Sequence, residues 1–376
     1  MNTLIYLDNA ATTPPDPQIV AGMAERELTC FGNPASPHQI GRAAKALLES
    51  ERERLAHAIG GAPESLIFTG GGTEANGLAI LGSAGDTPAH IAISAVEHSS
   101  IKESAHYLRD RFGWTVDVIP VDSMGRVQIP ALNDVLNPQT RIVSTMLVNG
   151  EVGCVNDVAK IADTVRLRSP RARLHCDAVQ GFGKLPISVD SLGVDSLSIA
   201  SHKIHGPNGV GALWCRHALR PILKGGGQEG GRRGGTQSGI LAWGMAEAFE
   251  RQFADRPQIE TLRDRLWRQV SEHLPDASLN GPPIGPERVI HNLHICLPGL
   301  PSEPLINALS AAGVCASGGS ACSTGKFSAV LSALGRSPKE GAFIRLTIGR
   351  FNTEAEIDEA VRRFVEVVAD LRMVYQ

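Results

Sequence analysis

Lys203 has the sequence surroundings of a nucleophilic amine. It follows an apolar run at 196–200, which is typical of the end of a buried strand, and it precedes a glycine-containing turn at 206–211. A lysine between two such segments is partly desolvated, and desolvation favours the neutral amine that can form a Schiff base. The alternative from these residues alone is an ordinary solvated loop lysine.

A second group with chemical potential is the run of Gly70, Gly71, Gly72 and Thr73, between a predicted strand and a predicted helix. Backbone amides freed by glycine, a hydroxyl and a helix N-terminus together form a cradle for an anion such as phosphate. The run matches no nucleotide-binding motif. A tight turn with a helix cap is the alternative.

Two further predicted strand ends carry polar side chains. Asp177 and Gln180 stand at the end of the strand predicted at 173–178, and His98 follows the strand predicted at 90–94. A carboxylate that leaves a buried sheet needs a cationic partner, and a protonated pyridine nitrogen is one. His98 could stack on a ring or move protons. The alternatives are a capping aspartate and a structural histidine.

A phosphate cradle, a buried acid, a stacking histidine and a Schiff-base lysine are the parts that a pyridoxal phosphate enzyme needs. Arg350 follows a predicted strand and could hold an α-carboxylate through two hydrogen bonds, or be a surface arginine. Cys322 lies in a run of Gly, Ser and Thr, where a loop thiol could accept a group from a substrate. An incidental free thiol is the alternative.

The elements that would position these residues alternate between short apolar strands and amphipathic helices, which indicates a parallel sheet of βαβ units. Strands are predicted at 66–69, 90–94, 115–121, 141–148, 173–178, 195–200 and 211–215. Helices are predicted at 16–29, 39–59, 74–82, 99–112, 129–136, 158–167 and 238–253. Ligands of such a sheet bind beyond the carboxyl ends of its strands, where the candidate residues lie.

The pattern changes near residue 255. Helices at 258–273, 303–312 and 353–371 and strands at 292–297 and 343–348 predict a smaller α+β unit. We predict an α/β fold with a large cofactor-binding domain at 16–254. The smaller domain is predicted to combine 1–15 with 255–376 and to carry the Cys322 loop.

Composition limits the partners that the chain is expected to have. A net charge of −3 with mixed signs and an aromatic content of 5% predict neither a nucleic-acid nor a membrane surface. The first residues lack the basic and apolar regions of a signal peptide, so a cytoplasmic enzyme is expected. Seven scattered cysteines without CxxC spacing predict no disulfide framework and no metal site.

Short stretches along nearly the whole chain resemble the cysteine desulfurases of the iron–sulfur assembly and nitrogen-fixation type, within the class V aminotransferase group. These stretches are 6–14, 31–36, 73–75, 97–98, 177–180, 202–203, 225–229, 319–322 and 344–351. The resemblance implies a fold-type I pyridoxal phosphate homodimer, with a mostly parallel seven-stranded sheet and an active site at the subunit interface.

The resemblance also implies roles for individual residues. Lys203 would form the Schiff base, His98 would stack on the cofactor ring, and Cys322 would take the sulfur. The implied cofactor ligands are Gly72, Thr73, His98, Asp177, Gln180, Ser201, His202, Lys203 and, from the neighbouring subunit, Thr236. Arg350 and Asn33 are the implied substrate ligands.

The activity implied by the resemblance is removal of sulfur from L-cysteine, with release of alanine. The sulfur would go to a protein acceptor or iron–sulfur scaffold. The alternatives are another class V aminotransferase, a β-lyase such as one acting on selenocysteine, and a catalytically impaired paralogue. The last alternative arises because Gly77, Gly150, Ala200 and Gly230 replace polar residues of the family, and because the loop after Cys322 is shorter.

Overall fold

The computed structural model describes residues 4–319 and 327–375. Its largest element is a seven-stranded sheet in the order β2-β8-β7-β6-β5-β3-β4. The strands are β2 (Leu66–Thr69), β3 (His90–Ser94), β4 (Thr115–Ile119), β5 (Thr140–Met146), β6 (Arg173–Asp177), β7 (Ser196–Ala200) and β8 (Gly211–Cys215). Only β8 runs antiparallel to its neighbours within this sheet, so the predicted mostly parallel seven-stranded fold is confirmed.

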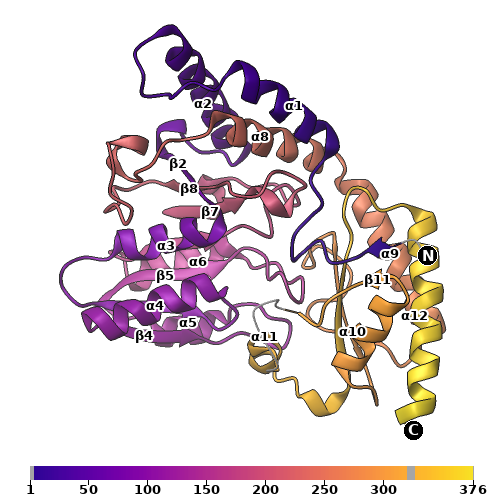
Figure 1. Cartoon of the computed structure of the whole chain (residues 1–376). Coiled ribbons are helices and arrows are strands. Elements are labelled where there is room, and N and C mark those ends of the chain that lie inside the picture. Colours follow the sequence, from indigo (N-terminus) through magenta and orange to yellow (C-terminus); the bar gives the residue numbers. More distant parts are fainter. Residues whose placement is uncertain (1–3, 320–326, 376) are drawn as a thin grey trace.

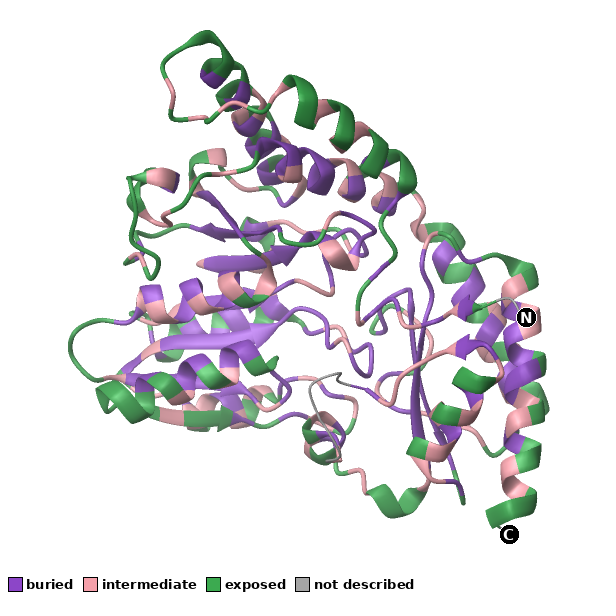
Figure 2. Ribbon diagram, in the orientation of Figure 1, coloured by how far each residue is buried: buried purple, intermediate pink, exposed green. Residues whose placement is uncertain are grey.

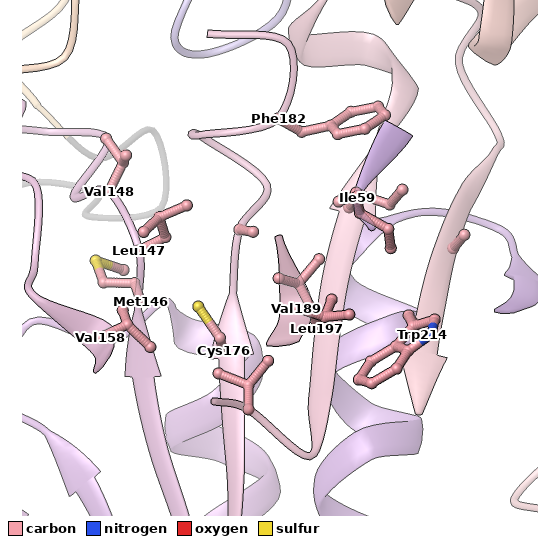
Figure 3. Close-up of a cluster of buried hydrophobic side chains, with 14 of the residues drawn as sticks. Ile59, Met146, Leu147, Val148, Val158, Cys176, Phe182, Val189, Leu197 and Trp214 are labelled. Carbon is pink, nitrogen blue, oxygen red and sulfur yellow. The ribbon is translucent and has the colours of Figure 1, made fainter. Parts of the chain in front are cut away.

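Helices cover both faces of this sheet because its strands alternate apolar side chains between two cores. Ile91 and Ile93 of β3 pack toward α3 (Gly72–Ser83) and α4 (Ser99–Phe112), whereas Ala92 faces the opposite core. That core also receives Leu197 and Trp214 (Figure 3). The helices on its side are α1 (Pro17–Thr29), α2 (Gln39–Ala58), α5 (Ile129–Val135), α6 (Val158–Arg168), α7 (Val189–Leu192) and α8 (Gly239–Ala254).

A second core lies beside the large sheet (Figure 1). It surrounds the antiparallel sheet β12-β10-β9, formed by β9 (Ser278–Leu279), β10 (Asn292–Leu297) and β12 (Ala342–Thr347). Its helices are α9 (Arg256–His273), α10 (Ser302–Ala311) and α12 (Glu354–Tyr375), and the short α11 (Ala329–Ala333) lies near the large sheet. Figure 2 shows the central strands of both sheets buried beneath helices with exposed outer faces, whereas the edge strand β4 is largely exposed.

The N-terminal segment belongs to the second core in space, although the first helix belongs to the large one. β1 (Ile5–Tyr6) pairs in parallel with β11 (Val314–Cys315), and Ile5 and Leu7 are buried in the second core. The chain then crosses from β1 to α1 (Figure 1). The boundaries predicted for the two domains stay a prediction, because a core cluster alone does not define where a domain ends.

The structure corrects several element boundaries. The strand predicted at 115–121 ends at Ile119, because Pro120 has no N–H for the ladder. The helix predicted at 353–371 continues to Tyr375. The two-residue strands β1, β9 and β11 were not predicted, nor were α7, α11 and the single-turn segments η1 (Pro63–Ser65), η2 (Ser201–Lys203), η3 (Gln228–Gly231) and η4 (Pro338–Glu340). Within the described residues, no helix is long and apolar enough to cross a membrane.

Candidate active site

Lys203 lies in η2, directly beyond the carboxyl end of β7. Its Nζ donates to the carbonyl oxygens of Ala10, at 2.8 Å, and Ala11, at 2.5 Å. The side chain is half-buried, as its flanking sequence predicts. The N-terminal segment therefore holds the reactive amine by its backbone, a contact that no local sequence pattern of Lys203 could have shown.

The glycine run lies at the start of α3, where the anion cradle is predicted. Gly71 has φ of +147°, which side-chain-bearing residues rarely adopt, and it caps α3 without a side-chain hydrogen bond. A Cβ on Gly72 would lie 2.8 Å from Cγ2 of Val179, so glycine is needed where the helix meets the segment after β6. The first amides of α3 and the exposed Thr73 hydroxyl are thus left for an anion.

Asp177 is buried at the end of β6, and its carboxylate accepts two hydrogen bonds. Val179 N donates to Oδ1 at 3.0 Å, and Asn76 Nδ2 donates to Oδ2 at 2.8 Å. Asn76 lies in α3, three residues beyond Thr73, so one helix presents both the anion cradle and the aspartate's partner. Sequence reasoning missed Asn76, although its position one helical turn from Thr73 was a usable signal.

Gln180 and Gly150 are packed against each other. The Gln180 side-chain nitrogen donates to the carbonyl of Ala10 at 2.9 Å, which is the same oxygen that Lys203 contacts. Its Oε1 is buried without a partner in the described structure. A Cβ on Gly150 would lie 2.8 Å from Cγ and Nε2 of Gln180, so the missing side chain at 150 leaves the space that Gln180 occupies.

His98 caps the N-terminus of α4 and keeps an exposed ring. Its Nδ1 lies 2.7 Å from Oγ of Ser100 and accepts from the Ser100 N–H at 3.1 Å. Because Ser100 also contacts Asn76 at 3.0 Å, His98 and Asp177 belong to one polar cluster. The structure thus brings together residues from the ends of β3 and β6, as predicted.

Ser201 and His202 directly precede Lys203, and their side chains have different surroundings. The His202 ring lies 3.2 Å from the Thr12 hydroxyl, and burial together with the Lys203 charge lowers the pKa of His202 to about 4. Ser201 Oγ is fully buried, lies against Gly206 and has no hydrogen-bond partner in the described structure. Ser201 therefore has a free hydroxyl, whereas Ala200, one residue earlier, contacts Gly72.

Arg350 was predicted to hold the substrate carboxylate, but Arg345, earlier in the same segment, is the one of these two arginines with a buried nitrogen that lacks a partner among the described residues. Arg350 already pairs with two carboxylates: its Nη1 lies 2.7 Å from Asp16 and its Nε lies 2.8 Å from Asp255. Arg345 lies in β12 with 5% of its side chain exposed, pairs with Asp8 at 2.8 Å and donates to the Gly150 carbonyl at 3.1 Å. Its Nε is buried without a partner in the described residues.

Gly150 packs against Gln180, and Gln180 and Lys203 donate to the same Ala10 carbonyl; we call these residues the Lys203 cluster. Arg345 contacts this cluster through the Gly150 carbonyl, whereas the Arg350 side chain pairs with Asp16 and Asp255. The sequence carried a signal for Arg345, since an arginine inside an otherwise apolar strand is costly unless it serves a site or an ion pair.

Asn33 and Thr236 are exposed and have no hydrogen bond to the Lys203 cluster among the described residues. Their loops instead flank a pocket of about 630 Å³ between α2 and the glycine-rich segment, lined among others by Pro34, Arg52 and Glu229. The Glu229 carboxylate is completely buried there and pairs with Arg52 at 2.7 Å. It also accepts from Gln237, next to Thr236, at 3.0 Å.

Cys322 lies outside the described residues. The described Gly319, three positions earlier, would place a Cβ 2.7 Å from the Glu151 carboxylate, beside Gly150. The chain that leads to Cys322 therefore reaches the Lys203 cluster. Six other cysteines are described and free. Burial raises the pKa of Cys154 to about 12 and also raises the pKa of Cys176 well above its usual value, so these core thiols are unreactive.

Two buried titratable residues were also missed by sequence reasoning. Burial and the neighbouring Lys203 charge lower the pKa of Lys184 to about 7. Burial and the Asp177 charge raise the pKa of Glu97, next to His98, to about 8. Within 4–319 and 327–375, no group of three His, Cys, Asp or Glu residues could hold a metal ion.

Comparisons with known proteins cover the whole chain. The family description "aminotransferase class-V" matches residues 5–360. Cysteine desulfurase IscS of Dictyoglomus turgidum is 35% identical over 387 residues, covering 100% of this chain and 97% of that protein. IscS of Pseudomonas fluorescens is 38% identical, covering 99% and 94%. A solved NifS-like protein has a TM-score of 0.90 at 31% identity, covering 98% of this chain and 100% of that one.

Proposed function

We propose, because this chain belongs to the class V aminotransferase family, that it is a pyridoxal-phosphate-dependent L-cysteine desulfurase. Curated relatives with that activity in their names align with its full length. The observation that carries the proposal is the convergence of Lys203, Asp177, His98 and the α3 cradle at one edge of the sheet.

The residues present fit the cofactor. The uncapped N-terminus of α3, with Gly72 and Thr73, would hold the phosphate, together with His202 and the unpartnered hydroxyl of Ser201. Asp177 would hold the ring nitrogen, and the Gln180 side-chain nitrogen, which donates one hydrogen to the Ala10 carbonyl, would donate its second hydrogen to the ring oxygen. When bound, the cofactor supplies an electron sink for an amino acid joined to it.

The chain's own groups prepare the amine and hold the substrate. Two backbone carbonyls orient the Lys203 amine, and Lys184 lies close enough that, after burial, the Lys203 charge helps to lower the Lys184 pKa. For the substrate carboxylate we propose Arg345, whose Nε has no partner, ahead of the predicted Arg350, which two carboxylates occupy. Asp16 and Asp255 already accept from the Arg350 guanidinium and offset its charge, so Arg350 attracts a third carboxylate only weakly.

Cys322 is proposed as the sulfur acceptor. Its thiolate sulfur forms a bond to the sulfur of L-cysteine while the carbon–sulfur bond of the substrate breaks. The electron pair of that broken bond stays on carbon and takes a proton, so the products are alanine and a persulfide on Cys322. The persulfide sulfur would then pass to a protein acceptor or iron–sulfur scaffold, or to another thio-cofactor pathway.

A homodimer is part of the proposal. Asn33 and Thr236 are exposed on loops that flank a pocket away from Lys203, where they have no contact with their own subunit's cluster among the described residues. Two such loops are suited to reach the site of a second copy. Thr236 would then complete the phosphate site of the partner, as the family resemblance implies.

Turnover of L-cysteine under a thiol reductant tests the proposed activity. We expect alanine and sulfide in equal amounts, with both lost in Cys322→Ser and retained in Cys315→Ser, a half-buried cysteine at β11. Keto-acid formation would instead indicate an aminotransferase, and alanine formation from selenocysteine alone would indicate a selenocysteine lyase. Bound cofactor without any product would indicate the impaired paralogue.

A further inference from the structure

A buried polar chain lies behind Asp177 between the sheet and helices α3 and α4. Its members are Ser196, His175, Asn76 and Ser100, and each is buried. His175 and Ser196 lie on the adjacent strands β6 and β7, Asn76 lies in α3 and Ser100 lies in α4. The function described above uses none of them directly.

The direction of the first hydrogen bonds follows from the carboxylate. Asp177, as a carboxylate, can only accept, so the amide nitrogen of Asn76 must face it, at 2.8 Å. The second hydrogen on that nitrogen points to Ser100 Oγ at 3.0 Å. The amide oxygen of Asn76 is thereby left facing His175 Nε2, at 3.1 Å.

The protonation of His175 is then determined. Complete burial lowers its pKa to about 4, so the ring is neutral and carries one proton. That proton is on Nε2, because Nε2 faces the Asn76 oxygen. His175 Nδ1 therefore accepts the hydroxyl hydrogen of Ser196 at 2.9 Å. Each group along this half of the chain has one permitted direction.

The other half of the chain ends on His98. Ser100 Oγ receives a hydrogen from Asn76, so its own hydrogen is available for His98 Nδ1 at 2.7 Å. The backbone N–H of Ser100 also donates to Nδ1, at 3.1 Å. A nitrogen that accepts two hydrogen bonds carries no proton.

We propose that this chain of hydrogen bonds holds neutral His98 as the tautomer with its proton on Nε2, and that it links that tautomer to the charge on Asp177. His175, Asn76 and Ser100 are positioning residues in this arrangement. The exposed Nε2–H can donate a hydrogen bond, and His98 can take up a proton only at Nδ1, after the hydrogen bonds there break. In the resting protein His98 therefore acts as a hydrogen-bond donor toward its site, a role that rests on the proposed function.

Nitrogen-15 NMR of histidine-labelled protein tests the tautomer directly, in the cofactor-free and the cofactor-loaded forms. The His98 signals are assigned by their loss in His98→Gln. We expect one tautomer, Nε2–H, in the wild type. In Ser100→Ala the backbone N–H of residue 100 is the one remaining donor to Nδ1 among the described residues, so we expect a measurable share of the Nδ1–H tautomer, with Ser100→Thr restoring the single form. Ser104→Ala is the matched control, because Ser104 Oγ donates to the Ser100 carbonyl and lies outside the chain.

Asp177→Asn provides a second measurement on His175. In this variant the amide oxygen of residue 177 takes the place of Oδ1, because the Val179 N–H needs an acceptor, and the amide nitrogen of residue 177 then faces Asn76. That nitrogen can only donate, so the Asn76 side chain turns and points its oxygen at residue 177. His175 would then move its proton to Nδ1. The unchanged signals of the buried His294 would verify the fold of each variant.

A wild-type His98 protonated on Nδ1, or a tautomer unchanged in Ser100→Ala, would overturn the proposal, as would an unchanged His175 in Asp177→Asn. Failure of cysteine turnover with these tautomers intact would instead remove only the proposed function.

Discussion

Arg345 and Arg350 differ in what already holds their guanidinium groups, and this difference makes the substrate site testable. We expect Arg345→Gln to raise the KM for L-cysteine about 10- to 100-fold, because a charge-assisted pair contributes about 1.5–3 kcal/mol. Arg350→Gln should change KM little and reduce stability, since it removes the cation paired with Asp255 and leaves Asp16 paired with Arg251. Steady-state kinetics and urea unfolding of both variants check this. A larger KM effect for Arg350→Gln would return the role to Arg350.

Glu97 gives a prediction on pH and stability. The pKa of Glu97 in the folded protein is about 8, above the ordinary 4.5, so the folded state holds this proton more tightly than the unfolded state. The contribution of that proton to the free energy of unfolding is therefore complete below pH 4.5 and is lost as the pH rises through 8. Glu97→Gln should therefore match the wild type near pH 5 and gain about 2–4 kcal/mol over it near pH 9.

Urea unfolding across this pH range measures the Glu97 effect, with the exposed Glu103→Gln in α4 as the control. Other titrating groups are common to these proteins, so their contributions cancel in the difference. A constant difference between Glu97→Gln and the wild type at all pH values would show that Glu97 stays ionised.

At the scale of elements, one buried ion pair holds the glycine-rich segment that leads to Thr236. Glu229 has a fully buried side chain, a φ of +52° and contacts to Arg52, Gln237 and the Phe68 amide. Glu229→Gln should cost about 3–5 kcal/mol of unfolding free energy, because it removes the buried partner of Arg52 and leaves the half-exposed Glu49 to pair with its charge. It should also weaken cofactor retention, since Thr236 loses its support.

Glu49→Gln is the matched control for this segment. Glu49 pairs with the same Arg52 at 2.9 Å but its side chain is 46% exposed, so its loss should cost about 0–1 kcal/mol. Denaturant unfolding and cofactor titration of the two variants decide the point. Equal effects of the two variants would show that the buried pair does not anchor the segment.

The strands of the large sheet could be predicted from sequence because each is a short, almost continuous apolar run. Those at 66–69, 90–94 and 211–215 are correct to the residue. Pairings between distant segments could not be predicted in this way. β1 pairs with β11 from Ile5 to Val314, most of the chain away, and Asn76 meets Asp177 across 101 residues. Such contacts depend on packing that no local pattern encodes.

The same limit applies to the site. Lys203, Asp177 and His98 could be found because each follows a recognisable strand. Other parts of the site could not be found in this way. The N-terminal segment must pack against Lys203 before the Ala10 and Ala11 carbonyls can contact it. Likewise, β12 must pack against Gly150 before Arg345 can reach the site. Glycine at 150 could be read as a lost contact, whereas the structure shows that it admits Gln180.

At the scale of the whole molecule, the proposed homodimer with Thr236 in the partner's site predicts complementation between inactive variants. Lys203→Ala and Thr236→Glu homodimers should each be inactive, the second because a carboxylate would repel the phosphate. Heterodimers of the two, isolated through different affinity tags, should recover activity, because one of their two sites has both residues intact. If Thr236 serves its own subunit, every site in the heterodimer contains a defect, and no activity returns.

The proposed function requires that the sulfur of L-cysteine becomes covalently bound to Cys322 as a persulfide. A single turnover without reductant, followed by alkylation and mass spectrometry of the peptides, measures this directly. We predict one added sulfur atom on the peptide containing Cys322, in the same amount as the alanine released, with none on the peptide containing Cys315. Alanine release with the added sulfur on another cysteine, or on none, would contradict the account.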